Sequence, residues 1–479
     1  MPGDLKQTFN MEQVIKYNYN YKYIWLISLV AAMGGFLFGY DWVVIGGAKP
    51  FYEPFFGLTS PAMKGWATSS AMIGCLLGAI GSGVFSDRYG RKRLMLISGL
   101  IFIVSSIGVG LSNQFNTFVV YRIIGGIAIG LASNLSPMYI AEVSPASVRG
   151  RFVSINQLTI AIGVLMAQMV NWLISISHEM PDHATAVQIS ESWNGQSGWR
   201  WMFAACAIPS LLFFVFSMLI PESPRWLVKN GESAKAFKVL DKIGGSLYAS
   251  EELSQIETTL QNEIGKVHFS ELFDKGIVKI LALGMFLAFF QQWCGINTIY
   301  YYAEDVFKAA GFDVKDVMFN IVITGVVSLA FTFVAIGTVD KYGRKILLLI
   351  GSMGLAATFG LIGLCYLLHL PGFLILALAV TAIAFYSFSL APIVWVLLSE
   401  IFPNRIRGAA MSIAVFTLWT GNFTLSYSFP ALNEGIGTTW TFWIYGIICL
   451  AGFLIIKKYL VETKGKSLEQ IEKEMVRSK

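Results

Sequence analysis

The sequence predicts an all-α, polytopic membrane protein, and three observations carry this prediction. The 479 residues are 55% hydrophobic and only 13% charged, about half the charge of an average soluble protein. The apolar residues come in long blocks such as LMLISGLIFIVSSIGVGL, and most Lys and Arg residues cluster in short loops between blocks. A membrane helix needs about 20 mainly apolar residues, so the chain has room for many.

Twelve apolar blocks are long enough to be membrane helices. They cover residues 24–47, 65–86, 94–112, 117–141, 152–174 and 199–220, and then 277–303, 318–339, 346–368, 374–399, 409–429 and 438–460. The polar segment between the two sets is rich in Lys, Glu and Leu, which favours short amphipathic helices. We therefore expect a six-helix bundle over 1–220, a cytoplasmic linker over 221–276, a second six-helix bundle over 277–460 and a cytoplasmic tail over 461–479.

The positions of the basic residues predict the orientation in the membrane. They follow the second, fourth, eighth and tenth predicted helices, as Arg88, Arg91, Lys92 and Arg93, then Arg149 and Arg151, then Lys341, Arg344 and Lys345, then Arg405 and Arg407. The connections after the third, fifth, ninth and eleventh helices have no Lys or Arg. Both termini are therefore expected in the cytoplasm, with the chain in a plasma membrane or bacterial inner membrane. The net charge of +6 reflects topology and does not predict a nucleic-acid partner.

The sequence predicts no enzyme, no cofactor and no metal site. Its five cysteines lie in apolar blocks without metal-ligand spacing, and no nucleophile constellation is recognisable. The stretch KGKS, Lys464 to Ser467, lacks the first glycine of a nucleotide-binding loop because position 460 is Leu. The N-terminal segment is polar and aromatic, so we expect the first apolar block to remain as helix 1.

Two pairs of motifs show that the halves repeat. GVFSDRYGRK, starting at Gly83, recurs as GTVDKYGRK from Gly337, and EVSPASVRG, starting at Glu142, recurs as EIFPNRIRG from Glu400. Each motif follows the same helix of its half, so the two halves have the same orientation. Such a parallel repeat is typical of transporters that rock two halves about a site near the membrane midplane.

These motifs, with RIIGGIAIG, SPMYIAEVSPASVRG, PESPRWL, QQWCGIN, WVLLSEIFPNRIRG and VETKGKSLEQIE, resemble the sugar porter family of the major facilitator superfamily. The resemblance covers essentially the whole chain and is strongest to bacterial proton symporters for D-xylose. It implies a twelve-helix major facilitator fold and alternating access. It also implies a monosaccharide and a proton as transported species, and a protein that functions as a monomer in the lipid bilayer.

Asp41, in FLFGYDWVVIGG, is the only carboxylate well inside a predicted span. A charge at the centre of a membrane helix costs roughly 2.5–3.5 kcal/mol on insertion scales. Arg122 is the only Arg well inside a span, and the two helices run in opposite directions, which places both residues at similar depth. We expect them to pair. The pair is either a static packing element or a proton switch, in which separation of the pair lets Asp41 take a proton. In the resembling symporters an aspartate at this position is linked to proton coupling.

Uncharged polar residues inside the spans mark a candidate sugar site, because amides both donate and accept hydrogen bonds and aromatic rings stack on C–H faces. These residues are Gln157, Gln291, Gln292, Asn297, Tyr301, Trp395, Trp419 and Asn422. The resemblance implies sugar contacts for all but Tyr301 and Asn422, which it implies line the pocket. Gly295 would permit local unwinding of the seventh helix. For each residue alone, hydrogen bonding between helices is the alternative.

Three positions depart from the family pattern. Ser328 replaces an Asn, Leu418 replaces a Gln or Asn, and Ala391 replaces a Gly. The first two changes remove hydrogen-bonding reach and the third removes space. We expect a pentose, D-xylose, to be favoured, although the lost amides also free volume and a hexose such as glucose stays possible.

The resemblance also implies a cytoplasmic gate built from charged residues at helix ends: Asp87, Arg91, Glu142 and Arg149 in the first half, and Asp340, Arg344, Glu400 and Arg407 in the second. The alternative is a set of solvated loop charges that only fix topology, which would not explain the twin Glu residues. Two other functions remain open, a facilitative uniporter and a transporter-like sugar sensor. Asp41 argues against the first, and the short tail after the last helix argues against the second.

Overall fold

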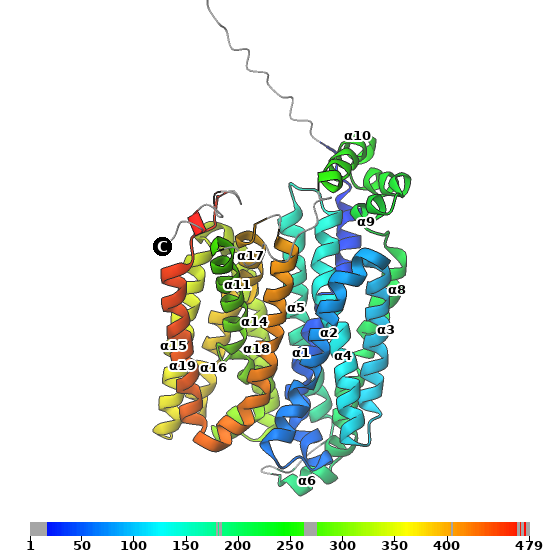
Figure 1. Ribbon diagram of the computed structural model, residues 1–479. Helices are drawn as coiled ribbons and strands as arrows, with labels where there is room; N and C mark the ends of the chain where they lie inside the picture. The colour runs from blue at the N-terminus through cyan, green and yellow to red at the C-terminus, as the bar shows by residue number, and fades with distance from the viewer. Residues whose placement is uncertain are drawn as a thin grey trace, which may run out of the picture.

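The computed structural model describes residues 17–178, 181, 184–262, 275–403, 406–466, 470, 474 and 475. Within this part of the chain all regular secondary structure is helical. The helices form two groups that stand side by side, one from the blue-to-green first half of the chain and one from the green-to-red second half (Figure 1).

The first half contains five long helices and a sixth, interrupted one. Its elements are α1 (Tyr21–Phe56), α2 (Pro61–Tyr89), α3 (Arg91–Gly110), α4 (Phe115–Val143), α5 (Arg149–Ile176), the short α6 (Ala186–Glu191), the π-helix η1 (Asn194–Gly198), α7 (Trp199–Ala204) and α8 (Ala207–Leu219). The last three follow one another and form the sixth crossing. Helix α1 is longer than the predicted span, which stops at residue 47, because the polar residues Lys49 and Glu53 interrupt the apolar pattern but not the helix.

The second half repeats this plan with two broken helices. Its elements are α11 (Lys275–Trp293), α12 (Ile296–Tyr301), α13 (Ala303–Ala309), α14 (Val314–Tyr342), α15 (Arg344–Leu367), α16 (Gly372–Phe388), α17 (Leu390–Ile401), α18 (Arg407–Ile436) and α19 (Thr438–Tyr459). The seventh crossing breaks at Gly295, whose φ of 91° is in the left-handed region that glycine adopts without strain. The predicted unwinding at this glycine is therefore present. The tenth crossing breaks at Ser389, between α16 and α17.

The linker between the halves forms α9 (Pro224–Lys229) and α10 (Ser233–Asn262), the latter kinked at Gly245. Residues 263–274 of the predicted linker, and most of the predicted tail beyond 466, lie outside the described residues. Helices α9 and α10 lie beyond one end of the bundle and α6 at the other (Figure 1). We call these the basic end, which also carries the turns at Gly90 and Gly343, and the α6 end.

Ten helical segments of the described chain are long and apolar enough to cross a membrane. The other two predicted crossings, α2 and α18, are 29 and 30 residues long but more polar. These two helices pack against each other across the junction of the halves, as do α5 and α14.

Candidate functional site

A cavity lies between the two halves, lined by α1 and α5 of the first half and by α11, α12, α14 and α16–α18 of the second. Its empty volume, including the solvent-filled space at its opening, is about 630 Å³. Six predicted site residues line it: Gln157, Gln291, Gln292, Trp395, Trp419 and Asn422. The three positions that depart from the family pattern, Ser328, Ala391 and Leu418, line it as well.

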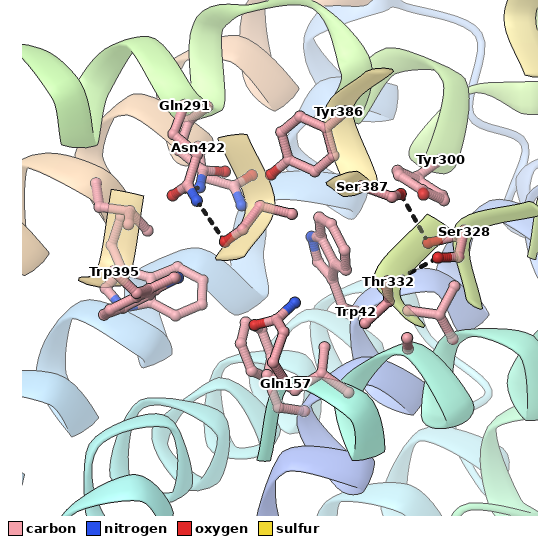
Figure 2. Close-up of a pocket in the computed structure, with 18 residues that line it drawn as sticks. Trp42, Gln157, Gln291, Tyr300, Ser328, Thr332, Tyr386, Ser387, Trp395 and Asn422 are labelled. Atoms are coloured by element: carbon pink, nitrogen blue, oxygen red, sulfur yellow. Dashed lines mark hydrogen bonds between the residues drawn. The ribbon is translucent and has the colours of Figure 1, made fainter. Parts of the chain in front are cut away.

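Gln157 offers the most accessible amide of the cavity. It comes from α5 and projects toward the space between the halves (Figure 2). Its side chain is only partly buried, and no hydrogen bond joins it to a residue of the described chain. The amide N–H donor and the amide oxygen acceptor of Gln157 are therefore both available to a ligand hydroxyl.

The amides of α11 and α12 are linked in a chain that spans the helix break at Gly295. Asn297 donates to Gln292 Oε1 at 2.8 Å, and Gln292 donates to Gln291 Oε1 at 3.4 Å. Gln291 in turn donates to the carbonyl oxygens of Leu390 and Ala391, at 2.9 and 3.1 Å. These carbonyls lie at the start of α17, so the two broken helices of the second half are joined at the cavity wall.

Two predicted site residues, Asn297 and Tyr301, do not line the cavity. Both are fully buried and lie one layer behind it, on α12 after the break at Gly295. Asn297 supports Gln292, and the Tyr301 hydroxyl accepts a hydrogen bond from Asn422 at 3.2 Å. The change of direction at Gly295 is the physical reason, because helical spacing from Gln292 no longer holds past it.

The other nine lining residues were not predicted as site residues. They are Phe38, Trp42, Ile160, Ala161, Val164, Tyr300, Thr332, Tyr386 and Ser387. In apolar blocks such residues give no contrast with the core. Ser387 could most easily have been predicted, because it is a polar residue inside an apolar block. Its hydroxyl pairs with that of Ser328, with the oxygens 3.1 Å apart.

Asp41 and Arg122 are paired as expected from their depth. Arg122 Nη1 donates to both carboxylate oxygens of Asp41 at 3.0 Å. Asp41 is 6% exposed and Arg122 2% exposed, and the guanidinium also lies over the Phe203 ring. Since Arg122 Nε has no hydrogen-bond partner among the described residues, Asp41 is the principal partner of this buried cation.

The ion pair faces a second, smaller cavity that adjoins the first. Its lining consists of Phe38, Asp41, Trp42, Ala71, Met72, Cys75, Arg122, Ile129 and Trp419. Phe38, Trp42 and Trp419 line both cavities. Three aromatic side chains therefore separate the candidate ligand site from the buried carboxylate.

Comparison with known proteins identifies the family to which this chain is related. The model of the sugar (and other) transporter family matches residues 27–475. The chain belongs to this family. It is 38% identical to the D-xylose-proton symporter of Escherichia coli (strain K12), over 95% of this chain and 96% of that protein. It is 39% identical to the arabinose-proton symporter of Bacillus subtilis (strain 168), over 94% of this chain and 95% of that protein.

Solved structures agree with the family. The partially occluded, inward open conformation of the xylose transporter XylE from E. coli superimposes with a TM-score of 0.82 at 36% identity, covering 93% of this chain and all of that one. The structure of XylE, a proton:xylose symporter of the major facilitator superfamily, bound to 6-bromo-6-deoxy-D-glucose gives a TM-score of 0.80 at 38% identity, covering 95% and 100%. The fold of this chain is therefore the major facilitator fold.

Within this family fold, a cluster of charges joins the halves at the α6 end. Lys49 of α1 is 2% exposed, and its ammonium lies 3.4 Å from Glu53, 3.4 Å from Glu304 and 2.8 Å from Asp305. Lys308 adds a pair to Glu304. Burial alone would raise the pKa of Glu304, but Lys49 and Lys308 outweigh it and hold that pKa below its ordinary value.

The backbones of the halves also meet close to this cluster. A Cβ added to Gly46 of α1 would lie 2.1 Å from the carbonyl oxygen of Tyr300 on α12. Only glycine permits that approach, so α1 and α12 are in direct backbone contact. The α6 end of the cavity is closed.

At the basic end the ion pairs of the described residues stay within each half. Arg91 pairs with Glu142 at 2.9 Å and with Asp87 at 3.1 Å, and Arg344 pairs with Glu400 at 3.1 Å. Asp340 lies on α14, but its side chain lies outside the described residues. Arg149 is exposed, and Arg407 donates only to the carbonyl of Phe402 while its buried Nη2 has no partner among the described residues.

Two glutamates missing from the sequence-based gate complete these networks. Glu222 accepts from the backbone N–H groups of Arg91 and Lys92 at 2.9 and 3.1 Å, and burial raises its pKa. Glu462 accepts from those of Arg344 and Lys345 at 2.9 and 3.0 Å. Each glutamate is the third residue after the last helix of its half, and each neutralises a helix N-terminus. The equal position of PES (221–223) and VET (461–463) after the two bundles is the sequence pattern from which these glutamates could have been predicted.

Next to them, a hydroxyl residue closes each network. Ser223 donates to Glu142, and Thr463 donates to Glu400. The repeat of the two halves therefore extends beyond the motifs in the loops to the segment that follows each bundle.

Proposed function

We propose that the chain is a secondary active transporter that carries a monosaccharide together with a proton by alternating access. D-xylose is the favoured substrate, and glucose or another hexose is the alternative. The protein works as a monomer in a cell membrane, with the basic end and both termini in the cytoplasm. The relatives that transport D-xylose or arabinose with protons support the substrate class.

One observation carries the proposal: the cavity between the halves and the cavity of the ion pair share a wall. A transporter that couples two species needs their sites close enough for one to sense the other. Here a neutral, amide-rich and aromatic cavity suits a sugar, and an adjacent buried carboxylate suits a proton. This carboxylate is the element that would distinguish a proton symporter from a uniporter.

The proposed sugar contacts divide into direct and supporting residues. Gln157, Gln291, Gln292 and Asn422 supply hydrogen bonds, and Trp395 and Trp419 supply stacking faces. Asn297 and Tyr301 hold Gln292 and Asn422 in place. The Trp419 indole N–H has no partner among the described residues, which leaves it available to a sugar hydroxyl.

The proposed proton site is Asp41, with Arg122 as its counter-ion. Beside Arg122 the carboxylate is stable as an anion in spite of its burial. When α1 moves against α4 the pair lengthens, the anion loses its partner, and proton uptake replaces the lost charge interaction. Proton occupancy then depends on conformation, which is the requirement for coupling.

The proposed gates lie at the two ends. With the α6 end closed by the Lys49 cluster, the conformation corresponds to a cavity that opens toward the cytoplasm, in line with the similarity to an inward open structure. Closing the basic end would bring the two halves together there. Arg149 and Arg407 pair with no carboxylate among the described residues, so they are the candidates to form pairs across the halves. Asp87, Arg91, Glu142, Asp340, Arg344 and Glu400 complete the gate.

The test is proton uptake by the purified protein in liposomes on addition of D-xylose, compared with Asp41→Asn. The unsubstituted protein is expected to take up protons with the sugar and to accumulate it against its gradient when the pH gradient is imposed. Asp41→Asn is expected to lose both, yet to keep exchange of labelled sugar between the two sides. Sugar exchange without proton uptake in the unsubstituted protein would establish a uniporter. Accumulation by Asp41→Asn would remove Asp41 from the coupling mechanism.

A further inference from the structure

Trp42 occupies the junction of the two cavities. It follows Asp41 directly on α1, and its side chain lines both the larger cavity and the cavity of the ion pair. Figure 2 shows the indole ring in the middle of the larger cavity, between Gln157 of the first half and Tyr386 and Ser328 of the second. Of the first-half residues in this cavity, it is the largest.

The ring of Trp42 reaches across to the second half. Its centroid is 5.2 Å from that of Tyr300 and 6.1 Å from that of Tyr301, the latter in an edge-on arrangement. These distances are typical of favourable aromatic pairs. Trp42 therefore lies against α12, the short helix after the break at Gly295, and one face and edge of the ring are fixed by these contacts.

The indole N–H is buried and unsatisfied. It lies near the Tyr301 hydroxyl, but it has no acceptor in hydrogen-bond geometry within the described residues. The Tyr301 hydroxyl already accepts from Asn422. A buried donor without a partner is unfavourable, and a ligand hydroxyl in the cavity is the group that would satisfy it.

The opposite wall explains why a large side chain fits here. Ser328, Thr332 and Ser387 are short and are bonded among themselves, Ser328 to Ser387 at 3.1 Å and Thr332 to the Ser328 carbonyl at 2.8 Å. Position 328 thus contributes no long amide, and Leu418 contributes no hydrogen bond. Trp42 fills space on the facing side and adds the donor that these two positions lack.

We propose that Trp42 is a substrate-binding and size-selecting residue. Its ring packs on a C–H face of the sugar, its N–H donates to a ring hydroxyl, and its bulk excludes the exocyclic hydroxymethyl group of a hexose. The selected substrate class is therefore an aldopentose in its ring form. This assignment rests on the proposed function, since it presupposes that the cavity binds a sugar.

The test compares the affinities of the purified, full-length protein for D-xylose and D-glucose in two variants. Trp42→Phe keeps most of the ring and removes the N–H, and it should weaken xylose binding about tenfold, the effect of losing one good hydrogen bond. Trp42→Ala removes the bulk, and it should raise the affinity for glucose relative to xylose by about tenfold or more. Trp201→Phe, at a 60% exposed tryptophan of α7, is the matched control and should change neither affinity.

The outcomes separate this proposal from the broader one. If the unsubstituted protein binds neither sugar, the proposed function fails. If it binds xylose and folded Trp42→Ala keeps the same ratio of affinities, size selection by Trp42 is overturned while the sugar site stands. Unchanged xylose binding in Trp42→Phe overturns the hydrogen bond. Trp42→Leu, which keeps an apolar side chain of intermediate volume, replaces Trp42→Ala if the latter elutes as an aggregate, and the same ratio decides the result.

Discussion

The ammonium of Lys49 lies 2.8 Å from the carboxylate of Asp305, and this contact joins the first half of the molecule to the second. Lys49 is nearly inaccessible to solvent, and two further carboxylates, Glu53 and Glu304, lie 3.4 Å from it. Three acidic groups thus share this buried cation, and Glu304 is also paired with Lys308. Removing one partner of a buried ion pair costs about 3–5 kcal/mol, so this cluster stabilises the closed α6 end.

Lys49→Met should therefore shift the protein toward a state open at the α6 end. The remaining carboxylates repel one another when they are buried together, and opening hydrates them. The shift is measured as a longer distance between spin labels placed at the α6 end of α2 and at the α6 end of α18. Lys308→Met is the matched control, because Lys308 pairs with Glu304 of its own half. Equal distances between the spin labels in Lys49→Met and Lys308→Met would contradict the role of the cluster.

If Asp41 is the proton site, transport should depend on pH through this residue, and Glu304 should not contribute to the dependence. A carboxyl whose pKa is lowered in the folded protein stays charged above its ordinary pKa, and its contribution is lost only as the pH falls through the lowered value. The pKa of Glu304 is lowered by Lys49 and Lys308, so its charge should be constant between about pH 6 and 8. Asp41→Asn should then reduce the pH dependence of sugar exchange over this interval. A pH dependence that persists in Asp41→Asn would point to another titrating group.

Gln157 and Gln291 should give different results when truncated, although both line the cavity. Gln157→Ala removes an amide that has no partner in the described chain, so sugar affinity should fall by about 1–1.5 kcal/mol with little change in melting temperature. Gln291→Ala also breaks the bonds to Leu390 and Ala391, and both affinity and melting temperature should fall. Gln168→Ala on the same helix as Gln157, which loses a bond to Thr324 outside the cavity, should leave affinity unchanged. Equal affinities in Gln157→Ala and the unsubstituted protein would place the sugar elsewhere.

The sequence was informative where a polar residue stood out from an apolar block. Asp41 and Arg122 could be paired from their depth in two antiparallel helices, because each is the only charge of its kind in such a position. The amides of QQWCGIN were recognisable for the same reason. Trp42 and Tyr300 were not, because an aromatic residue in an apolar helix looks the same whether it packs in the core or lines a cavity.

Positions after a helix break were also beyond sequence reasoning. Asn297 and Tyr301 were expected at the cavity surface, but the left-handed turn at Gly295 rotates α12 and places them behind Gln292 and Asn422. Helical periodicity predicts a face only while the helix is continuous. The repeated position of Glu222 could be found in the sequence, but its contact with the N-terminus of α3 can be identified only from the folded structure.

Glu222→Gln and Glu462→Gln should each lower the thermal stability of the protein. Each loses a charge that accepts from two backbone N–H groups at a helix N-terminus, an arrangement worth about 0.5–2 kcal/mol. The two decreases in melting temperature should be similar because the two networks repeat. Glu257→Gln, on the exposed face of α10 where it accepts from Ser233, is the control and should have little effect. A decrease in only one of the two variants would show that the networks are not equivalent.

Leu418→Gln should raise the affinity for whichever sugar presents a hydroxyl to α18. Leu418 is 2% exposed and lines the cavity beside Trp419, but it offers no hydrogen bond. A glutamine there can donate and accept, and one new bond to a sugar hydroxyl is worth about 1 kcal/mol, roughly a fivefold gain in affinity. Competition of labelled xylose uptake by unlabelled xylose, arabinose, glucose and galactose shows which sugar benefits. Thr420→Gln, two residues on along α18 and outside the cavity lining, should leave the ranking unchanged. A folded Leu418→Gln protein that binds every one of these sugars more weakly would mean that no sugar hydroxyl faces this helix.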